Sequence, residues 1–196
     1  MLDQRTVRNS NKPTKADTGR LDADAWTDAA LAELGAHGID GVRIEVLAKR
    51  LNVTKGSFYY HFRDRDALLE TMLTRWRRRA TLALIERLDS GVASPEERLR
   101  QLLRLPLKGQ TAALAADTEL AIRLWGRGDE RARIALEEVD ELRLQYIEKL
   151  LVQAGVTEEI AHARAILAYS YQRVAGTLIS SDATDLIQQC EDILLA

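Results

Sequence analysis

The sequence predicts an all-α protein of about nine helices, because apolar residues recur at spacings of three and four through most of the chain. Prolines are few, only three in 196 residues. No segment shows the alternation of apolar and polar residues, bounded by turns, that a strand requires. A chain of this length can form one core, or a small domain beside a larger one.

The first part of the chain divides into an arm and three short helices. Residues 1–20 are polar and contain turn formers, so they are expected to form a flexible basic arm. The expected helices are Asp22–Gly35, Ile44–Leu51 and Lys55–Phe62. Ala48 is small enough for a steep helix crossing, and Asn52 suits the left-handed turn that follows it. Residues 21–66 therefore predict a helix-turn-helix domain.

Longer helices follow in residues 67–196, which are expected to form a regulatory and dimerisation domain. The expected helices are Asp66–Ser90, Glu96–Leu105, Thr111–Trp125, Glu130–Ala154, Glu158–Ile179 and Asp185–Leu195. The first of them leaves the helix-turn-helix domain and runs directly into the C-terminal bundle. It can therefore act as a lever between the two domains.

The charge is unevenly distributed along the chain. Residues 1–79 contain 15 Lys/Arg against 11 Asp/Glu, whereas residues 80–196 contain 13 against 19. A mildly basic front on an acidic body favours a polyanionic partner at one end, although solvated surface is an alternative interpretation. No apolar run approaches the ~20 residues of a membrane-spanning helix, and no secretory signal is visible. With a single cysteine, Cys190, the protein is expected to be cytoplasmic.

Sequence motifs of enzymes and metal sites are not found. The three histidines show no ligand spacing with Cys190 or with carboxylate pairs, so no metal is expected. There is no phosphate loop, serine elbow or dinucleotide fingerprint. We therefore expect a protein that is not an enzyme and has no cofactor. The acidic run Glu137–Glu141 is interpreted as an exposed helix face.

The third helix is expected to present polar side chains to a partner. Its outward residues are Lys55, Ser57, Tyr59, Tyr60 and His61, with Gly56 allowing close approach to a phosphate. Val53 and Phe58 supply the apolar contacts that seat this helix on the one before it. The alternative is two turns of an ordinary helical bundle, and the spacing alone does not decide between them.

Two stretches, Gly38–Ala48 and Asn52–Leu69, resemble the DNA-binding domain of the tetracycline-repressor family. The run Tyr59-Tyr60-His61-Phe62, followed by Arg65 and Leu68, is the most specific part of this resemblance, which covers about residues 20–70. It implies a homodimer whose recognition helices enter successive major grooves of a palindromic operator. It also implies a ligand pocket in the C-terminal domain and a dimer interface formed by the last two helices.

By matched position, the resemblance implies a set of DNA contacts. These are Arg43, Lys55, Gly56, Ser57, Tyr59, Tyr60, His61 and Arg65. Three positions depart from the family pattern: Arg43 replaces the usual Thr or Ser, Asn52 replaces glycine, and Arg65 replaces lysine. Arg65 should preserve a phosphate contact and add a bidentate option.

The expected pocket residues lie on helices that surround the C-terminal core. They are Leu102, Leu105, Leu124, Trp125, Tyr146, Tyr169 and Gln172. Core packing is the alternative for each, and it is favoured for the aliphatic residues. Trp125, Tyr146 and Tyr169 are the stronger candidates, because buried tyrosine and tryptophan need a polar partner that a ligand could supply.

Dimerisation is expected through the last two helices. A stripe with many small residues would permit close helix approach: Ala161, Ala165, Leu167, Ala168, Ala175 and Leu178. The last helix adds an apolar face made of Leu186, Ile187, Ile193 and Leu194. A monomer would expose these faces to water.

Two functions remain open from the sequence. The first is a ligand-responsive transcriptional regulator, a repressor released from a palindromic operator by a small apolar effector. The second is a DNA-binding or scaffolding dimer without small-molecule input. A cavity in the C-terminal domain would distinguish them.

Overall fold

The computed structural model describes residues 22–196, and all regular secondary structure in this range is helical. The expected arm, residues 1–20, lies outside the described residues. The all-α prediction is confirmed. Within the described range the helices form nine separate runs, because α4 (Arg65–Arg77), the π-helical turn η2 (Arg78–Leu82) and α5 (Ala83–Asp89) follow one another without a break.

The N-terminal domain begins with three helices and a helical turn. They are α1 (Ala23–His37), η1 (Ile39–Gly41), α2 (Ile44–Arg50) and α3 (Lys55–His61). Asn52 has a φ of 56°, as expected for the turn between α2 and α3. The Val53 N–H donates to the carbonyl of Ala48 at 3.0 Å, and Ala48 is buried. Thr54 occupies the N-cap position of α3, and its side chain makes no capping hydrogen bond.

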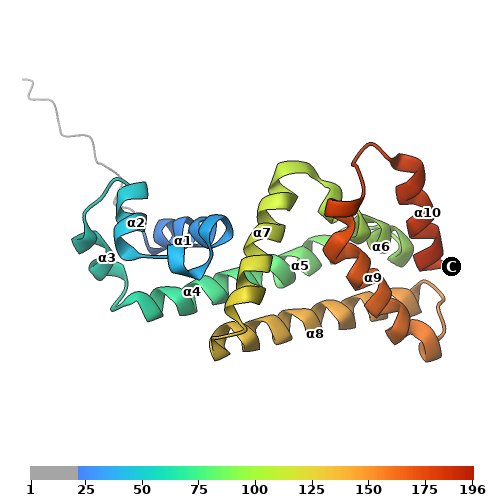
Figure 1. Ribbon diagram of the computed structural model, residues 1–196. Helices are drawn as coiled ribbons and strands as arrows, with labels where there is room; N and C mark the ends of the chain where they lie inside the picture. The colour runs from blue at the N-terminus through green and yellow to red at the C-terminus, as the bar shows by residue number, and fades with distance from the viewer. Residues whose placement is uncertain (1–21) are drawn as a thin grey trace, which may run out of the picture.

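The rod formed by α4, η2 and α5 joins the two domains (Figure 1). The Asp64 carboxylate caps its start by accepting from the backbone N–H of Ala67 at 2.9 Å. Trp76 is buried, and two of the three arginines that follow it make ion pairs, Arg77 with Glu138 and Arg79 with Asp28.

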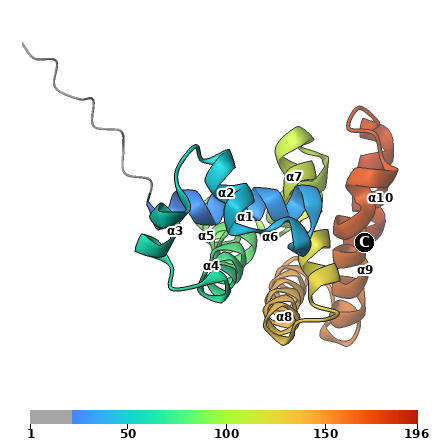
Figure 2. The same ribbon diagram turned by 60° about the vertical axis from the view of Figure 1, so that its left-hand side comes forward.

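The C-terminal domain packs against the second half of this rod. Its helices are α6 (Pro95–Leu103), η3 (Leu105–Leu107), α7 (Gly109–Trp125), α8 (Glu130–Gln153), α9 (Glu158–Leu178) and α10 (Thr184–Leu195). In Figure 2 the helix-turn-helix lies at one end of the molecule, and α9 and α10 lie at the other. The helix α7 stands between them and packs on α1.

Two apolar cores hold the molecule together. The first contains the helix-turn-helix domain, for example Trp26 and Phe58, and also residues of α7 and the first half of α8, such as Trp125 and Val139. The second joins α5, α6, the second half of α8, and α9. The first core is therefore continuous across residue 66, the boundary expected from the sequence. A movement of α7 and α8 would be transmitted to α2 and α3, because well-packed cores deform little.

The small residues of α9 pack inside the protomer, which corrects one expectation. Ala161, Ala165, Ala168 and Ala175 are buried. They allow α9 to lie close to α8, the helix with which it makes its most extensive contact. The face of α9 that points outward is different and consists of large apolar side chains: Ile160, Ile166, Leu167, Val174 and Leu178.

In α10, Ile187 is buried while Leu186 and Ile193 are exposed. Glu191 of the same helix is fully buried and pairs with Arg100 of α6 and with Arg104, which follows α6, and these pairs fix α10 on the bundle.

Across the described range, none of the helices is long and apolar enough to cross a membrane.

Candidate functional site

The outer face of α3 carries the residues expected to contact DNA. Phe58 is completely buried and packs edge-on against Trp26, with ring centroids 5.3 Å apart. This anchor turns the neighbouring side chains outward, so Tyr59 is 59% exposed and Tyr60 is 67% exposed. Lys55 lies on the first turn of the same helix and is exposed. Large exposed aromatic side chains beside a lysine are suited to contact phosphates and base edges.

The remaining predicted DNA contacts lie around this face. Arg43 precedes α2 as its N-cap residue and is exposed, and Gly56 is exposed on α3. Ser57 and His61 are half-buried. The Lys55 ammonium donates to the carboxylate of Glu45 at 2.6 Å on the exposed surface. Such a pair is weak and exchanges readily for a phosphate contact.

Arg65 has a structural task that the sequence did not reveal. Its Nε donates to the carbonyl of Val42 at 2.7 Å, and its Nη2 donates to the carbonyl of Ile39 at 3.0 Å. These bonds tie the start of α4 to η1 and to Val42, the residue that follows η1. Arg65 therefore holds the helix-turn-helix in position relative to the rod, and only part of its guanidinium is left for a phosphate.

The predicted pocket residues do not converge on a single space. Leu102, Tyr146 and Gln172 line a cavity of about 10 Å³ inside the C-terminal bundle. Leu124 and Trp125 line a separate groove of about 270 Å³ between α1, η1 and α7. Leu105 packs against the second core, and Tyr169 belongs to that core. The bundle cavity has room for about one water molecule, so it is closed in this structure.

The three aromatic candidates already have polar partners within the chain, which removes the argument that selected them. The Tyr146 hydroxyl donates to Asp89 at 2.8 Å, and the Tyr169 hydroxyl donates to Asp140 at 2.6 Å. Burial and the bond to Asp89 raise the pKa of Tyr146 to about 12. Trp125 pairs with Asp129 through its side chain. None of these hydroxyl or indole groups needs a ligand to satisfy it.

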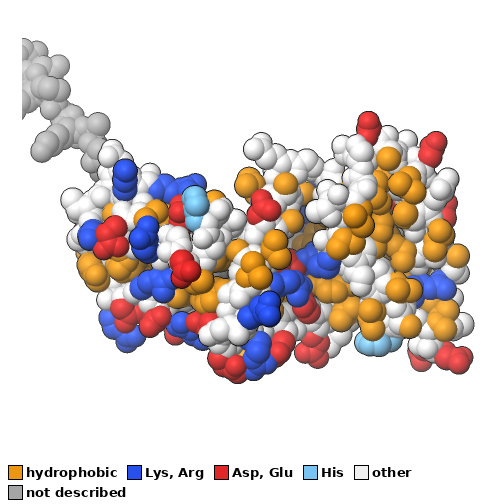
Figure 3. All heavy atoms as spheres, viewed as in Figure 1, with side chains coloured by type: hydrophobic (Ala, Val, Ile, Leu, Met, Phe, Trp, Pro, Cys, Tyr) orange, Lys and Arg blue, Asp and Glu red, His pale blue; other side chains and the backbone are white. Residues whose placement is uncertain are grey.

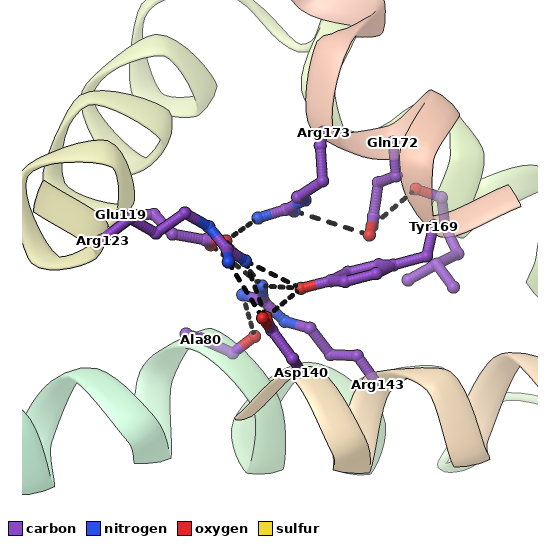
Figure 4. Close-up of polar contacts among 9 residues, drawn as sticks. Ala80, Glu119, Arg123, Asp140, Arg143, Tyr169, Gln172 and Arg173 are labelled. Carbon is purple, nitrogen blue, oxygen red and sulfur yellow. Dashed lines mark hydrogen bonds and ion pairs between the residues drawn. The ribbon is translucent and has the colours of Figure 1, made fainter. Parts of the chain in front are cut away.

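A network of charged side chains lies between the two cores, and Figure 4 shows its members pointing toward one another from α7, α8 and α9. At its centre the Glu119 carboxylate, only 6% exposed, accepts from Arg123 at 3.1 Å, from Arg143 at 2.9 Å and from Arg173. Asp140 accepts from Arg123 at 2.7 and 2.9 Å and from the Tyr169 hydroxyl.

The charge balance of this network is positive. Burial opposes the ionisation of Glu119, but Arg143 and Arg173 outweigh it and lower the pKa of this carboxyl to about 2. Burial raises the pKa of Tyr169, so this hydroxyl stays neutral. Three arginines therefore face two carboxylates. Among the described residues of this largely buried cluster, the positive charges therefore outnumber the negative charges by one.

The network also holds the rod. The Arg143 Nη2 donates to the backbone carbonyl of Ala80 at 3.1 Å, and Ala80 lies in the π-helical turn η2 (Figure 4). A π-helical turn interrupts the regular bonding of a helix and leaves its backbone groups in an altered register. Arg143 thus connects the charged network directly to the rod that joins the helix-turn-helix domain.

Sequence reasoning missed this network for a physical reason. Glu119, Arg123 and Arg143 lie on helices with many exposed charged positions, and side-chain periodicity does not reveal which charges pair across helices. The interpretation of Glu137–Glu141 as an exposed face is wrong for Asp140, which binds Arg123 and Tyr169. The one available signal was the recurrence of charged residues beside buried positions such as Val139.

The fold and the surface of α3 define a two-domain, all-helical protein with an N-terminal helix-turn-helix. Residues 27–72 match the family described as bacterial regulatory proteins, tetR family. This match covers the helix-turn-helix domain, the same part of the chain as the resemblance at residues 20–70.

Relatives extend the likeness over most of the chain. The HTH-type transcriptional repressor KstR of Rhodococcus jostii is 28% identical over 170 residues, which cover 84% of this chain and 76% of KstR. A transcriptional regulator of Saccharomonospora viridis, solved with choline, has a TM-score of 0.69 at 18% identity over 88% of this chain and 94% of its own. FadR of Bacillus subtilis, solved with stearoyl-CoA, has a TM-score of 0.64 at 17% identity over 88% and 97%. These proteins are transcriptional regulators, and the structural likeness shows the fold.

Proposed function

We propose that this protein is a homodimeric transcriptional repressor that binds a palindromic operator through α3 and releases it when a small, largely apolar effector binds in the C-terminal domain. The observation that carries the proposal is the exposed face of α3, on which Tyr59, Tyr60 and Lys55 stand over the buried anchor Phe58. The similarity to a named repressor, KstR, favours repression over activation.

The proposed DNA-contact set is Arg43, Lys55, Gly56, Ser57, Tyr59, Tyr60, His61 and Arg65. Lys55, Tyr59 and Tyr60 are the contacts best supported by exposure. Arg65 combines a phosphate contact with its bonds to the Val42 and Ile39 carbonyls. In a two-fold dimer each contact occurs twice, once in each half-site, and the half-sites lie about one helical turn apart or a multiple of it.

The proposed dimer interface is the outward apolar face of α9 and α10. Leu167 is 61% exposed and Leu178 is 76% exposed, and Leu186 and Ile193 continue the surface on α10. Figure 3 shows hydrophobic side chains gathered at the end of the molecule where these helices lie. A contiguous apolar face of this kind is unfavourable in water and is covered when two copies pair.

Replacing Leu167 with glutamate is expected to convert the dimer into a monomer, because two charged side chains would be buried at the two-fold interface. The matched control is Leu142→Glu, which changes an exposed leucine on α8. Analytical ultracentrifugation at micromolar concentration measures the mass of both variants. A dimeric Leu167→Glu variant, or a monomeric wild type with full helical content, would contradict this interface.

The proposed effector site is the closed cavity of the C-terminal bundle and the charged network beside it. The cavity is lined by Thr81, Leu84, Ile85, Leu102, Arg143, Tyr146, Ile147 and Gln172. Thr81 and Ala80 lie in η2, so a ligand that opens the cavity must displace the rod or the helices packed on it. Because the first core binds α7 and α8 to the helix-turn-helix domain, such a displacement changes the separation of the two α3 helices.

The alternative, a DNA-binding or scaffolding dimer without small-molecule input, rests on the closed state of the cavity. The charged network favours the ligand-responsive function, because plain dimerisation gives no reason for an uncompensated positive charge between the two cores.

The test is selection of operator DNA from a pool of random duplexes by the full-length protein. The proposal predicts enrichment of a palindrome whose half-sites are separated by a whole number of helical turns. A pool selected in parallel with the Phe58→Tyr variant, which disturbs the seat of α3, is the control. Failure of the wild-type protein to enrich any sequence would overturn the proposed function.

A further inference from the structure

We propose that the effector is an acidic amphiphile, an apolar molecule with one anionic group, and that the anionic group binds beside Thr81 and Arg143. This inference rests on the proposed function and adds the chemical class of the ligand. It is carried by three observations, namely an unused buried hydroxyl, an excess of positive charge, and the apolar walls of the adjoining cavity.

Thr81 has a hydroxyl that behaves differently from those of comparable threonines. Its side chain is 1% exposed, and its Oγ1 has no hydrogen-bond partner among the described residues. Four other helical threonines donate to the carbonyl four residues earlier: Thr27 to Ala23, Thr71 to Ala67, Thr74 to Glu70, and Thr118 to Leu114. A buried hydroxyl without a hydrogen-bond partner destabilises the folded protein. A bound ligand that accepts a hydrogen bond from Thr81 would remove this free-energy penalty.

The location of Thr81 explains why its hydroxyl is available. It lies in the π-helical turn η2, where the helix departs from α-helical register. It lines the same cavity as Arg143 and Gln172, so a ligand atom placed there reaches a hydroxyl donor and a guanidinium. A hydroxyl donor next to an arginine recognises an oxygen that carries negative charge.

The net positive charge around the cavity favours a ligand with a negative charge. Within the described part of the chain, Arg123, Arg143 and Arg173 share the carboxylates of Glu119 and Asp140 alone. An entering carboxylate would bring the local charge to zero, whereas a cation would increase the excess. The Nε of Arg173 is a further buried donor without a partner among the described residues.

The rest of the cavity selects an apolar body. Leu84, Ile85, Leu102 and Ile147 form its walls. The walls close to about 10 Å³ in this structure, so binding must separate the side chains of the second core from the rod. The ligand therefore opens the cavity while its charged end engages Arg143, the residue that holds the Ala80 carbonyl.

The experiment compares three probes of equal chain length on the DNA-free, full-length dimer. Isothermal titration calorimetry measures binding of decanoate, decanol and decyltrimethylammonium below their micelle concentrations. Decanoate is expected to bind at least about tenfold more tightly than decanol, because a charged hydrogen bond is replaced by a neutral one. The cation is expected not to bind. Equal binding of decanol, tighter binding of the cation, or binding of none of the three would overturn the proposal.

A pair of variants locates the anionic group. Thr81→Val keeps the side-chain shape and removes the unused hydroxyl, so decanoate binding should weaken about tenfold while the unliganded protein keeps or gains thermal stability. The matched control is Thr27→Val, a buried threonine whose hydroxyl is satisfied by the Ala23 carbonyl, which should leave decanoate affinity unchanged. Unchanged decanoate affinity in Thr81→Val would overturn the assigned position.

These outcomes are separable from those of the proposed function. Decanoate binding is measured without DNA, whereas the proposed function fails if no operator is selected. Decanoate binding without selection of an operator would support the ligand site and contradict the proposed repressor function. Selection of an operator together with tighter binding of decanol than of decanoate would support the repressor function and contradict the acidic ligand.

Discussion

Alanine at Lys55 or Tyr60 is expected to weaken operator binding by about a hundredfold, or ~2.7 kcal/mol, because the same interaction with DNA disappears from both half-sites. Both residues are exposed on α3, and Lys55 pairs with Glu45 on the open surface. The far-ultraviolet circular dichroism of each variant should therefore match the wild type. Fluorescence anisotropy on the selected operator measures the affinity.

The control for this prediction is Lys149→Ala, which removes an exposed lysine from α8 at a distance from the helix-turn-helix domain. It should leave operator affinity unchanged. Lys55→Ala should also reduce the slope of log affinity against log salt concentration by about one unit for each phosphate that the lysine neutralises in the wild type. Wild-type affinity in both the Lys55 and Tyr60 variants would show that the recognition surface lies elsewhere.

The second large effect is expected from Glu119→Gln. The substitution removes the carboxylate that three arginines share and leaves their charges largely buried, so the free energy of unfolding at neutral pH should fall by about 3 kcal/mol. The Tyr169 and Asp140 contacts remain, so the variant should still fold. Urea denaturation followed by circular dichroism measures the difference.

The stability difference between the wild type and Glu119→Gln should decrease as the pH is lowered. The pKa of Glu119 in the folded protein is about 2, below its usual value of 4.5. Its ionisation therefore contributes stability above about pH 4.5, and this contribution is lost progressively as the pH falls toward 2. The wild type and Glu119→Gln should converge in stability over this interval. A gap that stays constant between pH 7 and pH 3 would contradict the assigned role of the carboxylate.

The helices of this protein could be predicted from the sequence because they follow apolar periodicity and local signals. The predicted helix Glu130–Ala154 corresponds to α8, Glu130–Gln153, and the left-handed Asn52 marks the turn as expected. Tyr59 and Tyr60 were expected among the outward residues of the third helix, and both are exposed.

The proposed effector site could not be predicted in the same way, because it depends on contacts between distant segments. Glu119 and Arg173 are 54 positions apart, and their pairing requires that α7 and α9 meet beside α8. Thr81 lies where the helical register changes at η2 and has no hydrogen-bond partner among the described residues. No pattern in the sequence predicts this change of register. The buried tyrosines Tyr146 and Tyr169 were expected to need a ligand, but their partners are Asp89 and Asp140.

The coupling between the bundle and α3 depends on the continuity of the first core and of the rod. Arg143 contacts the Ala80 carbonyl in the rod, and Arg65 ties the start of the same rod to η1 and Val42. A ligand that disturbs the first contact therefore acts on an element whose other end is fixed to the DNA-binding domain. A hundredfold loss of operator affinity requires a coupling free energy of about 2.7 kcal/mol, which lies within the usual range.

The most direct test of this account is to measure both sides of the coupling on the wild-type dimer. Operator affinity is titrated with and without saturating decanoate, and decanoate affinity is titrated with and without saturating operator. Decanoate and operator are each expected to weaken the binding of the other by the same factor, about a hundredfold, because linkage between two binding sites is reciprocal. Simultaneous binding of decanoate and operator, with neither affinity changed, would contradict the claim that the charged network controls the DNA-binding helices.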